Sequence, residues 1–158
     1  MTNFDVLNVS QFDGLLSTGK IAAMFRFMEF GARQEGMSNA ALAAFLTQYA
    51  IQKNYTQPRE ALFGATLKDW SQPKAKPAAW AVNAAVSFLV EMEWVPVTER
   101  EWVIWAYVLF REAGKPGLND LESVIPVYMC ADESLKQNAL NALKSAYMSA
   151  EAFSKKRK

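Results

Sequence analysis

Residues 61–92, ALFGATLKDWSQPKAKPAAWAVNAAVSFLVEM, contain the pattern that decides the fold class of this chain. The stretch predicts a helix that ends near Trp70, followed by a connector over residues 71–76. A second helix is predicted from Pro77 to about Trp94, because proline suits the first turn, where its missing N–H would have no partner inside the helix. In this second helix the apolar side chains recur at helical spacing, which predicts one buried face. Those residues are Trp80, Ala81, Ala84, Ala85, Phe88, Leu89 and Met92.

The connector at residues 71–76 is expected to be semi-rigid and basic. Its nearby prolines disfavour α conformation in the residues before them, so the connector is predicted to hold the two helices at a fixed angle. Lys74 and Lys76 belong to the connector, and Lys68 lies one helical turn before it. We call Lys68 together with residues 71–76 the basic elbow.

Upstream of this stretch, two further helices are predicted. The first begins at Ser17 or Thr18 and reaches about Gln34, and Gly36 supplies a left-handed stop after it. The second begins after a Ser38 cap, whose side chain is suited to accept a hydrogen bond from a free backbone N–H. Its apolar stripe consists of Leu42, Phe45, Leu46 and Tyr49.

The segments that flank these helices show weaker patterns. A polar turn over residues 53–57 precedes Pro58, which is predicted to open the helix that ends near Trp70. Residues 1–16 are predicted to be an N-terminal arm. Within the arm, the early apolar residues fit either a short strand or an extended segment packed on the helices.

Downstream of the second helix, Thr98 and Glu101 form a capping box. In this motif each side chain satisfies a backbone N–H at the helix start that would otherwise lack a partner. The helix that follows is predicted to end at Gly114. Trp102 and Trp105 lie one turn apart in it and are predicted to belong to its buried face.

Two more helix starts are predicted near the C-terminus. Asn119 with Glu122 has the spacing of a second capping motif, and Pro126 is expected to end or kink the short helix that follows. Asp132 is predicted to cap the last helix. Residues 154–158, SKKRK, are expected to form a basic, frayed tail.

These signals together predict an all-α protein, organised as a compact single domain over residues 1–158 with six to seven helices. The chain has 158 residues and is 51% apolar, which excludes a disordered chain. No run of 18 apolar residues is present, so no membrane span is expected. The sequence lacks a signal peptide pattern and has one cysteine, Cys130, which predicts a cytoplasmic location.

The composition argues against an enzyme. The sequence contains no histidine, which removes the serine–histidine and cysteine–histidine arrangements and the usual zinc sites. Residues 14–20, GLLSTGK, match part of a phosphate-binding loop, but Ile21 stands where that loop has a magnesium-binding hydroxyl. We interpret the segment as a helix start. No cofactor and no metal are expected.

A local excess of positive charge marks the candidate binding site. The net charge of the chain is only +1, so any electrostatic attraction must be local. Within residues 53–76 five basic residues stand against two acidic ones. The basic residues are Lys53, Arg59, Lys68, Lys74 and Lys76, and the acidic ones are Glu60 and Asp69. Such a patch is suited to phosphate contacts, while a merely solvated face is the alternative.

Two pieces of the chain resemble the helix-turn-helix domains of Xre/Cro-type repressors of phages and bacteria. Residues 36–46, GMSNAALAAFL, are similar to the opening of the first motif helix. Residues 67–81, LKDWSQPKAKPAAWA, resemble the end of a recognition helix and the basic connector after it, although the gap between the pieces is longer than in the family. The resemblance implies DNA binding. The positions that it would place against DNA are Thr66, Lys68, Lys74 and Lys76.

Two functions follow from these observations. The first is a non-enzymatic DNA-binding regulator, which would suit a homodimer and in which Asn54 or Thr66 would reach bases. The second is an accessory or inhibitor factor of phage or plasmid type, which occupies a host protein with an acidic surface through the elbow or a tryptophan-rich face. Under both hypotheses the predicted binding residues are Arg59, Thr66, Lys68, Trp70, Lys74 and Lys76.

Overall fold

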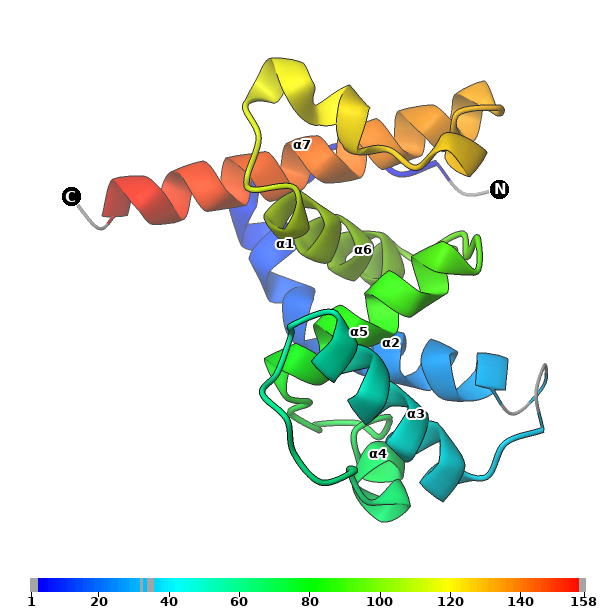
Figure 1. Cartoon of the computed structure of the whole chain (residues 1–158). Coiled ribbons are helices and arrows are strands. Elements are labelled where there is room, and N and C mark those ends of the chain that lie inside the picture. The colour runs from blue at the N-terminus through cyan, green and yellow to red at the C-terminus, as the bar shows by residue number, and fades with distance from the viewer. Residues whose placement is uncertain (1–2, 32, 34–35, 157–158) are drawn as a thin grey trace. The chain divides into compact units, whose positions relative to one another are not determined.

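The protein is all-α in the part of the chain that the computed structural model describes, which is residues 3–31, 33 and 36–156. This confirms the predicted fold class, since these residues contain helices and no strand (Figure 1). The described residues form seven α-helices and two short 3₁₀ helices. In chain order they are α1 (Val9–Gly14), α2 (Leu16–Phe30), α3 (Asn39–Gln52), α4 (Gly64–Asp69), α5 (Ala79–Glu91), α6 (Glu99–Glu112), η2 (Leu118–Val124), η3 (Val127–Met129) and α7 (Glu133–Lys156).

The helices group into two compact units. Unit 1 comprises Met1–Gly19 and Glu93–Lys158, and unit 2 comprises Lys20–Met92. Unit 2 is therefore continuous in sequence, whereas unit 1 combines a segment before it with a segment after it. The expectation of a single domain over residues 1–158 stays a prediction.

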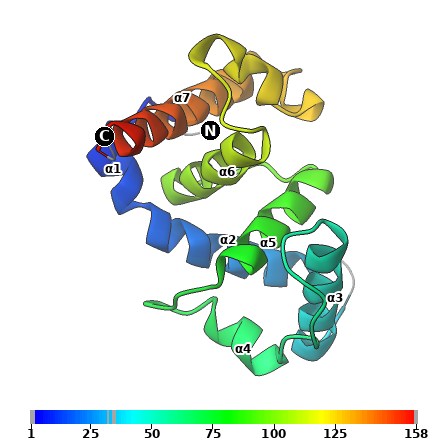
Figure 2. The ribbon, with the colours of Figure 1, turned by 60° about the vertical axis from the view of Figure 1, so that its left-hand side comes forward.

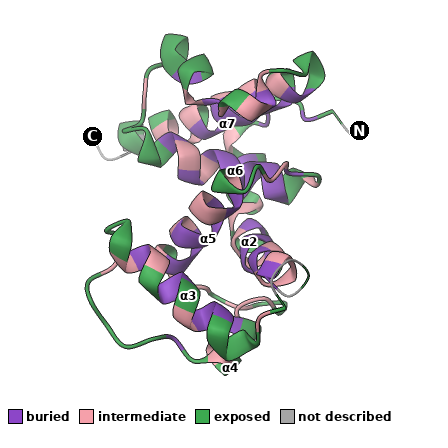
Figure 3. Ribbon diagram, turned by 45° about the vertical axis from the view of Figure 1, so that its right-hand side comes forward, coloured by how far each residue is buried: buried purple, intermediate pink, exposed green. Residues whose placement is uncertain are grey.

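The core of unit 1 lies between α6 and α7. Trp102 and Trp105 are 2% and 0% exposed, which confirms that both belong to the core. Figure 3 shows the buried residues along α6. Besides the two tryptophans they include Val103, Ile104 and Val108, so burial extends beyond the predicted face. The buried residues of α7 include Leu135, Ala139 and Leu143, as the helical spacing indicated.

The N-terminal arm is held along α7 by hydrogen bonds between side chains and backbone. The Phe4 N–H donates to Asn138 Oδ1 at 2.9 Å, and Asn141 Nδ2 donates to the Phe4 carbonyl at 2.9 Å. One turn further along α7, Ser145 Oγ accepts from the Leu7 N–H at 2.8 Å. These α7 side chains lie at helical spacing, so they form one polar face. That face supplies hydrogen-bond partners to the backbone of the arm, as a neighbouring strand would.

The arm is shorter than the sequence suggested. It is extended over residues 3–8, and the strand alternative is wrong for them. The next residues form α1, which the prediction of an arm over residues 1–16 missed. Asn8 and Gln11 form a capping box there: Asn8 Oδ1 accepts from the Gln11 N–H at 2.8 Å, and Gln11 Oε1 accepts from the Asn8 N–H at 3.1 Å. With only six residues, α1 is too short to show helical periodicity.

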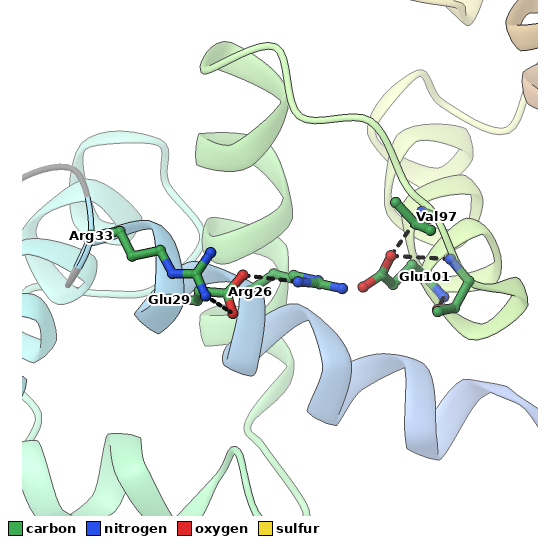
Figure 4. A network of polar contacts seen from close by, with 6 residues as sticks. Arg26, Glu29, Arg33, Val97 and Glu101 are labelled. Atoms are coloured by element: carbon green, nitrogen blue, oxygen red, sulfur yellow. Dashed lines mark hydrogen bonds and ion pairs between the residues drawn. The ribbon is translucent and has the colours of Figure 1, made fainter. Parts of the chain in front are cut away.

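The capping box at the start of α6 is confirmed (Figure 4). One carboxylate oxygen of Glu101 accepts from the Val97 N–H at 2.8 Å and from the Thr98 N–H at 3.2 Å. In return, Thr98 Oγ1 accepts from the Glu101 N–H at 3.3 Å. Glu101 is only 2% exposed, so its burial is compatible with a role in capping.

An aromatic cluster lies where α2, α3 and α5 of unit 2 meet, with Phe27 buried and its other rings half-buried or exposed. Phe88 of α5 makes edge-to-face contacts with four rings, at centroid distances from 5.0 to 5.7 Å. Those rings belong to Phe27, Phe30, Phe45 and Tyr49.

On α2, the Glu29 carboxylate pairs with Arg26 at 2.9 Å and with Arg33 at 3.6 Å (Figure 4).

The predicted starts of two helices in unit 2 are wrong. Residues 58–63 are not helical, and α4 begins at Gly64 rather than at Pro58. The reason is a contact from α3: the Leu62 N–H donates to Thr47 Oγ1 at 3.0 Å, which holds this segment extended. The helix predicted from Pro77 to about Trp94 begins at Ala79 and ends at Glu91, so the proline lies before the N-terminal cap.

The limits of α2 also differ from the prediction. The helix begins at Leu16 and has no Ser17 or Thr18 cap, because Thr18 Oγ1 donates to the Leu15 carbonyl at 3.3 Å instead. The predicted end near Gln34 lies outside the described residues, and the α-helix ends at Phe30. The cap at Ser38 is confirmed, as is the left-handed backbone of Gly36, with φ of 64°. Gly114, where the later helix was predicted to end, lies two residues after the end of α6 and has a φ of 82°.

Two predictions near the C-terminus are wrong. Asn119 does not cap a helix, because a 3₁₀ helix starts at Leu118 and the Glu122 carboxylate pairs with Lys136 of α7 at 2.6 Å. The basic tail is helical up to Lys156, where α7 ends, so the predicted fraying is absent from this part of the tail. The last two residues lie outside the described part. The Asp132 cap is confirmed, since its side chain accepts from the Leu135 N–H at 3.0 Å.

Candidate functional site

A close approach to α3 fixes the position of α4. A Cβ atom at Gly64 would lie 2.7 Å from the backbone nitrogen of Ala40 and 2.9 Å from the carbonyl carbon of Asn39. Glycine therefore lets the first residue of α4 lie directly against the first turn of α3. On the same helix Leu67 is 0% exposed. These two contacts define the face of α4 that is unavailable to a partner.

The connector after α4 contains a β-turn with a lysine in an unusual position. The Ala75 N–H donates to the Gln72 carbonyl at 3.2 Å, which closes the turn. Pro73 occupies the second position, and Lys74 occupies the third with a φ of 66°, the combination found in type II turns. Glycine or asparagine usually takes that third position, because left-handed backbone costs other residues about 1 kcal/mol. The turn thus holds a lysine at an energetic cost.

The lysines of the basic elbow are accessible. Lys68, Lys74 and Lys76 are all exposed, and no ion pair joins their ammonium groups to any residue of the described chain. In Figure 2 the connector extends away from α4 and α5 as a narrow loop. The predicted charge of the elbow is therefore available to an anionic partner.

Two aromatic rings and a guanidinium group meet at the residues that flank the connector in sequence. The Trp70 and Trp80 rings meet edge to face, with centroids 6.3 Å apart, and both residues are half-buried. The guanidinium carbon of Arg59 lies 4.8 Å from the centre of the Trp80 ring, while Arg59 itself is exposed. The sequence did not predict this contact, because Arg59 precedes α4 along the chain and Trp80 follows it.

A shallow groove adjoins Arg59. Its volume is about 700 Å³, and it is lined by residues 56–63 together with Thr66. Thr66 is half-buried, and its carbonyl accepts from the Trp70 N–H at 3.0 Å. Phe63 contributes a ring that is 77% exposed. Phe63 was not predicted as a site residue, because no sequence signal distinguishes an exposed apolar residue beside a glycine from a buried one.

Lys53 does not add its charge to the elbow. Its Nζ pairs with Glu91 at 2.8 Å and lies 5.5 Å from the centre of the Tyr49 ring. Asn54 is exposed in the turn that follows α3, with a φ of 63°. Of the predicted basic residues, the structure therefore leaves Arg59 and the three elbow lysines as the candidate site.

The Lys53–Glu91 pair shifts the titration of its carboxylate. Partial burial raises the pKa of Glu91, but hydrogen bonds from Lys53 and Tyr49, together with the Lys53 charge, outweigh burial and lower that pKa below its ordinary value. Burial, with a further contribution from the neighbouring Glu91, raises the pKa of the Tyr49 hydroxyl above its ordinary range. At neutral pH the Glu91 carboxylate is therefore charged and the Tyr49 hydroxyl is neutral.

Acidification is expected to lower the stability of the protein by protonating the Glu91 carboxylate. Because the folded-state pKa is the lower one, the contribution of Glu91 to stability is complete above its ordinary pKa and is lost as pH falls through the lowered value. The difference in melting temperature between wild type and Glu91→Gln should thus shrink as the pH falls into the acidic range. Thermal melts over a pH series test this. Glu60→Gln, at an exposed position, is the control, and a difference for Glu91→Gln that stays constant with pH would contradict the expectation.

Other candidate chemistry is not supported by the described residues. Their cysteine, aspartate and glutamate side chains form no group of three that could hold a metal ion. Leu16 to Lys20 are helical, so the interpretation of GLLSTGK as a helix start is confirmed. Cys130 is half-buried, and its Sγ donates to the Pro126 carbonyl at 3.6 Å.

Comparisons with known proteins do not identify a family. The chain matches no protein-family model, and no curated protein or solved structure is significantly similar to it. The resemblance to Xre/Cro-type repressors therefore stays a prediction. In the described residues, no helix is long and apolar enough to span a membrane.

Proposed function

We propose that this all-α chain is a non-enzymatic binding protein that attaches to nucleic acid through the basic elbow. The observation that carries the proposal is the exposure of Lys68, Lys74 and Lys76 without an acidic partner in the described chain. Exposed cations that are not neutralised internally are suited to displace counterions from a phosphate backbone. The unusual backbone of Lys74 supports the same function, since a left-handed non-glycine residue often marks a functional position.

Salt dependence follows from the number of cations. With three phosphate contacts, raising the salt from roughly 50 to 200 mM should reduce affinity about 40-fold for a duplex and about 20-fold for a single strand. A site of this size predicts weak, electrostatically driven binding rather than the steep dependence of large repressors. The proposed role is that of a small regulator, and homodimerisation would double the number of contacts.

Reversing the charge of the connector is expected to abolish binding. In Lys74→Glu/Lys76→Glu, two attractive phosphate contacts become repulsive, so affinity for a fluorescein-labelled oligonucleotide should fall at least about 50-fold. Fluorescence anisotropy at low salt measures this. Lys115→Glu/Lys155→Glu is the matched control, because it changes the net charge equally at exposed positions outside the elbow.

A further variant separates the charge of Lys74 from its conformation. Lys74→Gly fits the positive φ, so its free energy of unfolding should equal that of wild type or exceed it by up to about 1 kcal/mol. Its affinity should nevertheless fall several-fold. If both the charge reversal and the glycine variant bind like wild type, the elbow is not the nucleic-acid site.

Exposure of Phe63 favours a second candidate function. This ring is 77% exposed beside Arg59, and exposed aromatic and arginine residues are enriched in protein interfaces. Under this proposal the chain is an accessory or inhibitor factor of phage or plasmid type that occupies a host protein with an acidic surface. Binding to such a partner should be lost in Phe63→Ser, whereas absence of oligonucleotide binding at low salt would favour this function over the first.

A further inference from the structure

The geometry points to unpaired nucleic acid, rather than a duplex, as the ligand of the basic elbow. We infer this preference for single strands from the length of α4 and from the side chains that surround the elbow. The inference rests on the proposed nucleic-acid function and deepens it by naming the class of ligand.

Helix α4 is poorly suited to read a duplex. It has six residues, which corresponds to a length of about 9 Å, against a major groove about 12 Å wide. Gly64 lies against α3 and Leu67 is buried, so neither faces solvent freely. Of the remaining positions, Ala65, Lys68 and Asp69 are exposed and Thr66 is half-buried, and the negative charge of Asp69 offsets the positive charge of the neighbouring Lys68 toward phosphates on either side of a groove. The helix therefore offers little to base edges.

The groups around the elbow are suited to stack on unpaired bases. Proteins that bind single strands combine a basic surface with aromatic rings or guanidinium planes on which bases stack. Here the guanidinium carbon of Arg59 lies 4.8 Å from the centre of the Trp80 ring, and Arg59 is an exposed residue. A base stacked on Arg59 would continue the series of contacts that runs from Trp70 to Trp80 to Arg59. Such stacking requires a base that is not already enclosed in a duplex.

Phe63 supplies a second surface for stacking in the same groove. Its ring is 77% exposed, and the groove of about 700 Å³ includes both Phe63 and Arg59. Neighbouring bases of one strand can therefore occupy Phe63 and Arg59, while the elbow lysines contact the phosphates. This explains why an apolar ring remains exposed beside cations, which neither a solvated face nor duplex binding requires.

A comparison of single and double strands tests the inference on the whole chain. Fluorescein-labelled oligothymidylate of 15 nucleotides and a hairpin duplex of 15 base pairs are titrated with protein, and anisotropy is measured at moderate salt. The single strand should bind about tenfold more tightly or better. Oligouridylate of the same length distinguishes RNA from DNA as the source of the unpaired strand, and tight binding of either one supports the inference.

Two variants examine stacking without removing charge or bulk. Arg59→Lys keeps the positive charge but lacks the guanidinium plane, and Phe63→Leu keeps an apolar side chain but lacks the ring. Each should weaken single-strand binding about fivefold or more while leaving duplex affinity unchanged. Both side chains are exposed, so thermal melts should match wild type and exclude misfolding.

The outcomes separate the inference from the proposed function. Equal affinity for the hairpin and the single strand, or unchanged single-strand binding in both variants, would overturn the preference for unpaired bases and leave the proposed nucleic-acid function in place. Absence of binding to every oligonucleotide at low salt would overturn the proposed function itself.

Discussion

Replacement of Phe88 by alanine should reduce the free energy of unfolding by about 3 kcal/mol. Phe88 contacts four rings from α2 and α3 edge to face, with the nearest centroid, that of Phe45, at 5.0 Å. Each such pair contributes about 0.5–1.5 kcal/mol beyond the burial of area. Because Phe88 is half-buried, the loss should lie near the lower limit for a core phenylalanine.

Urea denaturation followed by far-ultraviolet circular dichroism measures this loss. Phe88→Leu keeps most of the volume and should cost about half as much as the alanine variant. Phe63→Ala is the matched control, since that ring is 77% exposed and its removal should change stability by no more than about 0.5 kcal/mol. Equal losses for Phe88→Ala and Phe63→Ala would show that the ring contacts of Phe88 do not stabilise unit 2.

A single added methyl group at Gly64 should also be strongly destabilising, by about 1–3 kcal/mol. The backbone of Gly64 has no positive φ, so alanine is excluded by space and not by conformation. The atoms that the methyl group would meet belong to the backbone of Asn39 and Ala40, which cannot rotate away as a side chain would. Helix α4 would have to move off α3, and the elbow would move with it.

Gly14→Ala provides the comparison, because a Cβ atom at Gly14 meets nothing within 4 Å. Alanine is the better helix former, so this variant should be neutral or gain up to about 1 kcal/mol. The two substitutions are compared by urea denaturation, and the Gly64 variant is also tested for oligonucleotide binding. Stability of Gly64→Ala equal to that of wild type would mean that α3 and α4 are not held by this contact.

The sequence predicted well those features that depend on neighbouring residues. The caps at Ser38, Thr98 and Asp132 each act on a backbone N–H within the next few residues, so the local pattern contains both partners. The buried stripes of α6 and α7 follow from periodicity over three turns or more. Short elements gave weaker signals, and α1, with one buried residue, escaped notice for that reason.

Features set by distant residues could not be predicted. Pro58 is a valid start for a helix by local rules, yet Thr47 of α3 accepts from the Leu62 N–H and keeps the segment extended. Similarly, Glu122 has the spacing of a capping residue but pairs with Lys136 of α7. In both cases a tertiary contact overrides a valid local preference.

The candidate site likewise combines features that the sequence could predict with features that depend on distant residues. Exposure of the elbow lysines was predicted from their position in a proline-flanked connector, and the structure confirms it. The place of Arg59 over Trp80 was not predictable, because it depends on how the segment before α4 returns toward α5. Charge excess alone also overestimated the patch by including Lys53, which is paired with Glu91.

The division of unit 1 into two separate stretches of sequence has a consequence for how the chain folds during translation. Unit 2 is complete once Met92 has left the ribosome, so its aromatic cluster can form while the rest of the chain is still being synthesised. The N-terminal arm, in contrast, needs Asn138, Asn141 and Ser145, and must wait until α7 emerges. Phe4 can meet Trp102 of α6 earlier, but the backbone of the arm lacks its hydrogen-bond partners until α7 has been synthesised.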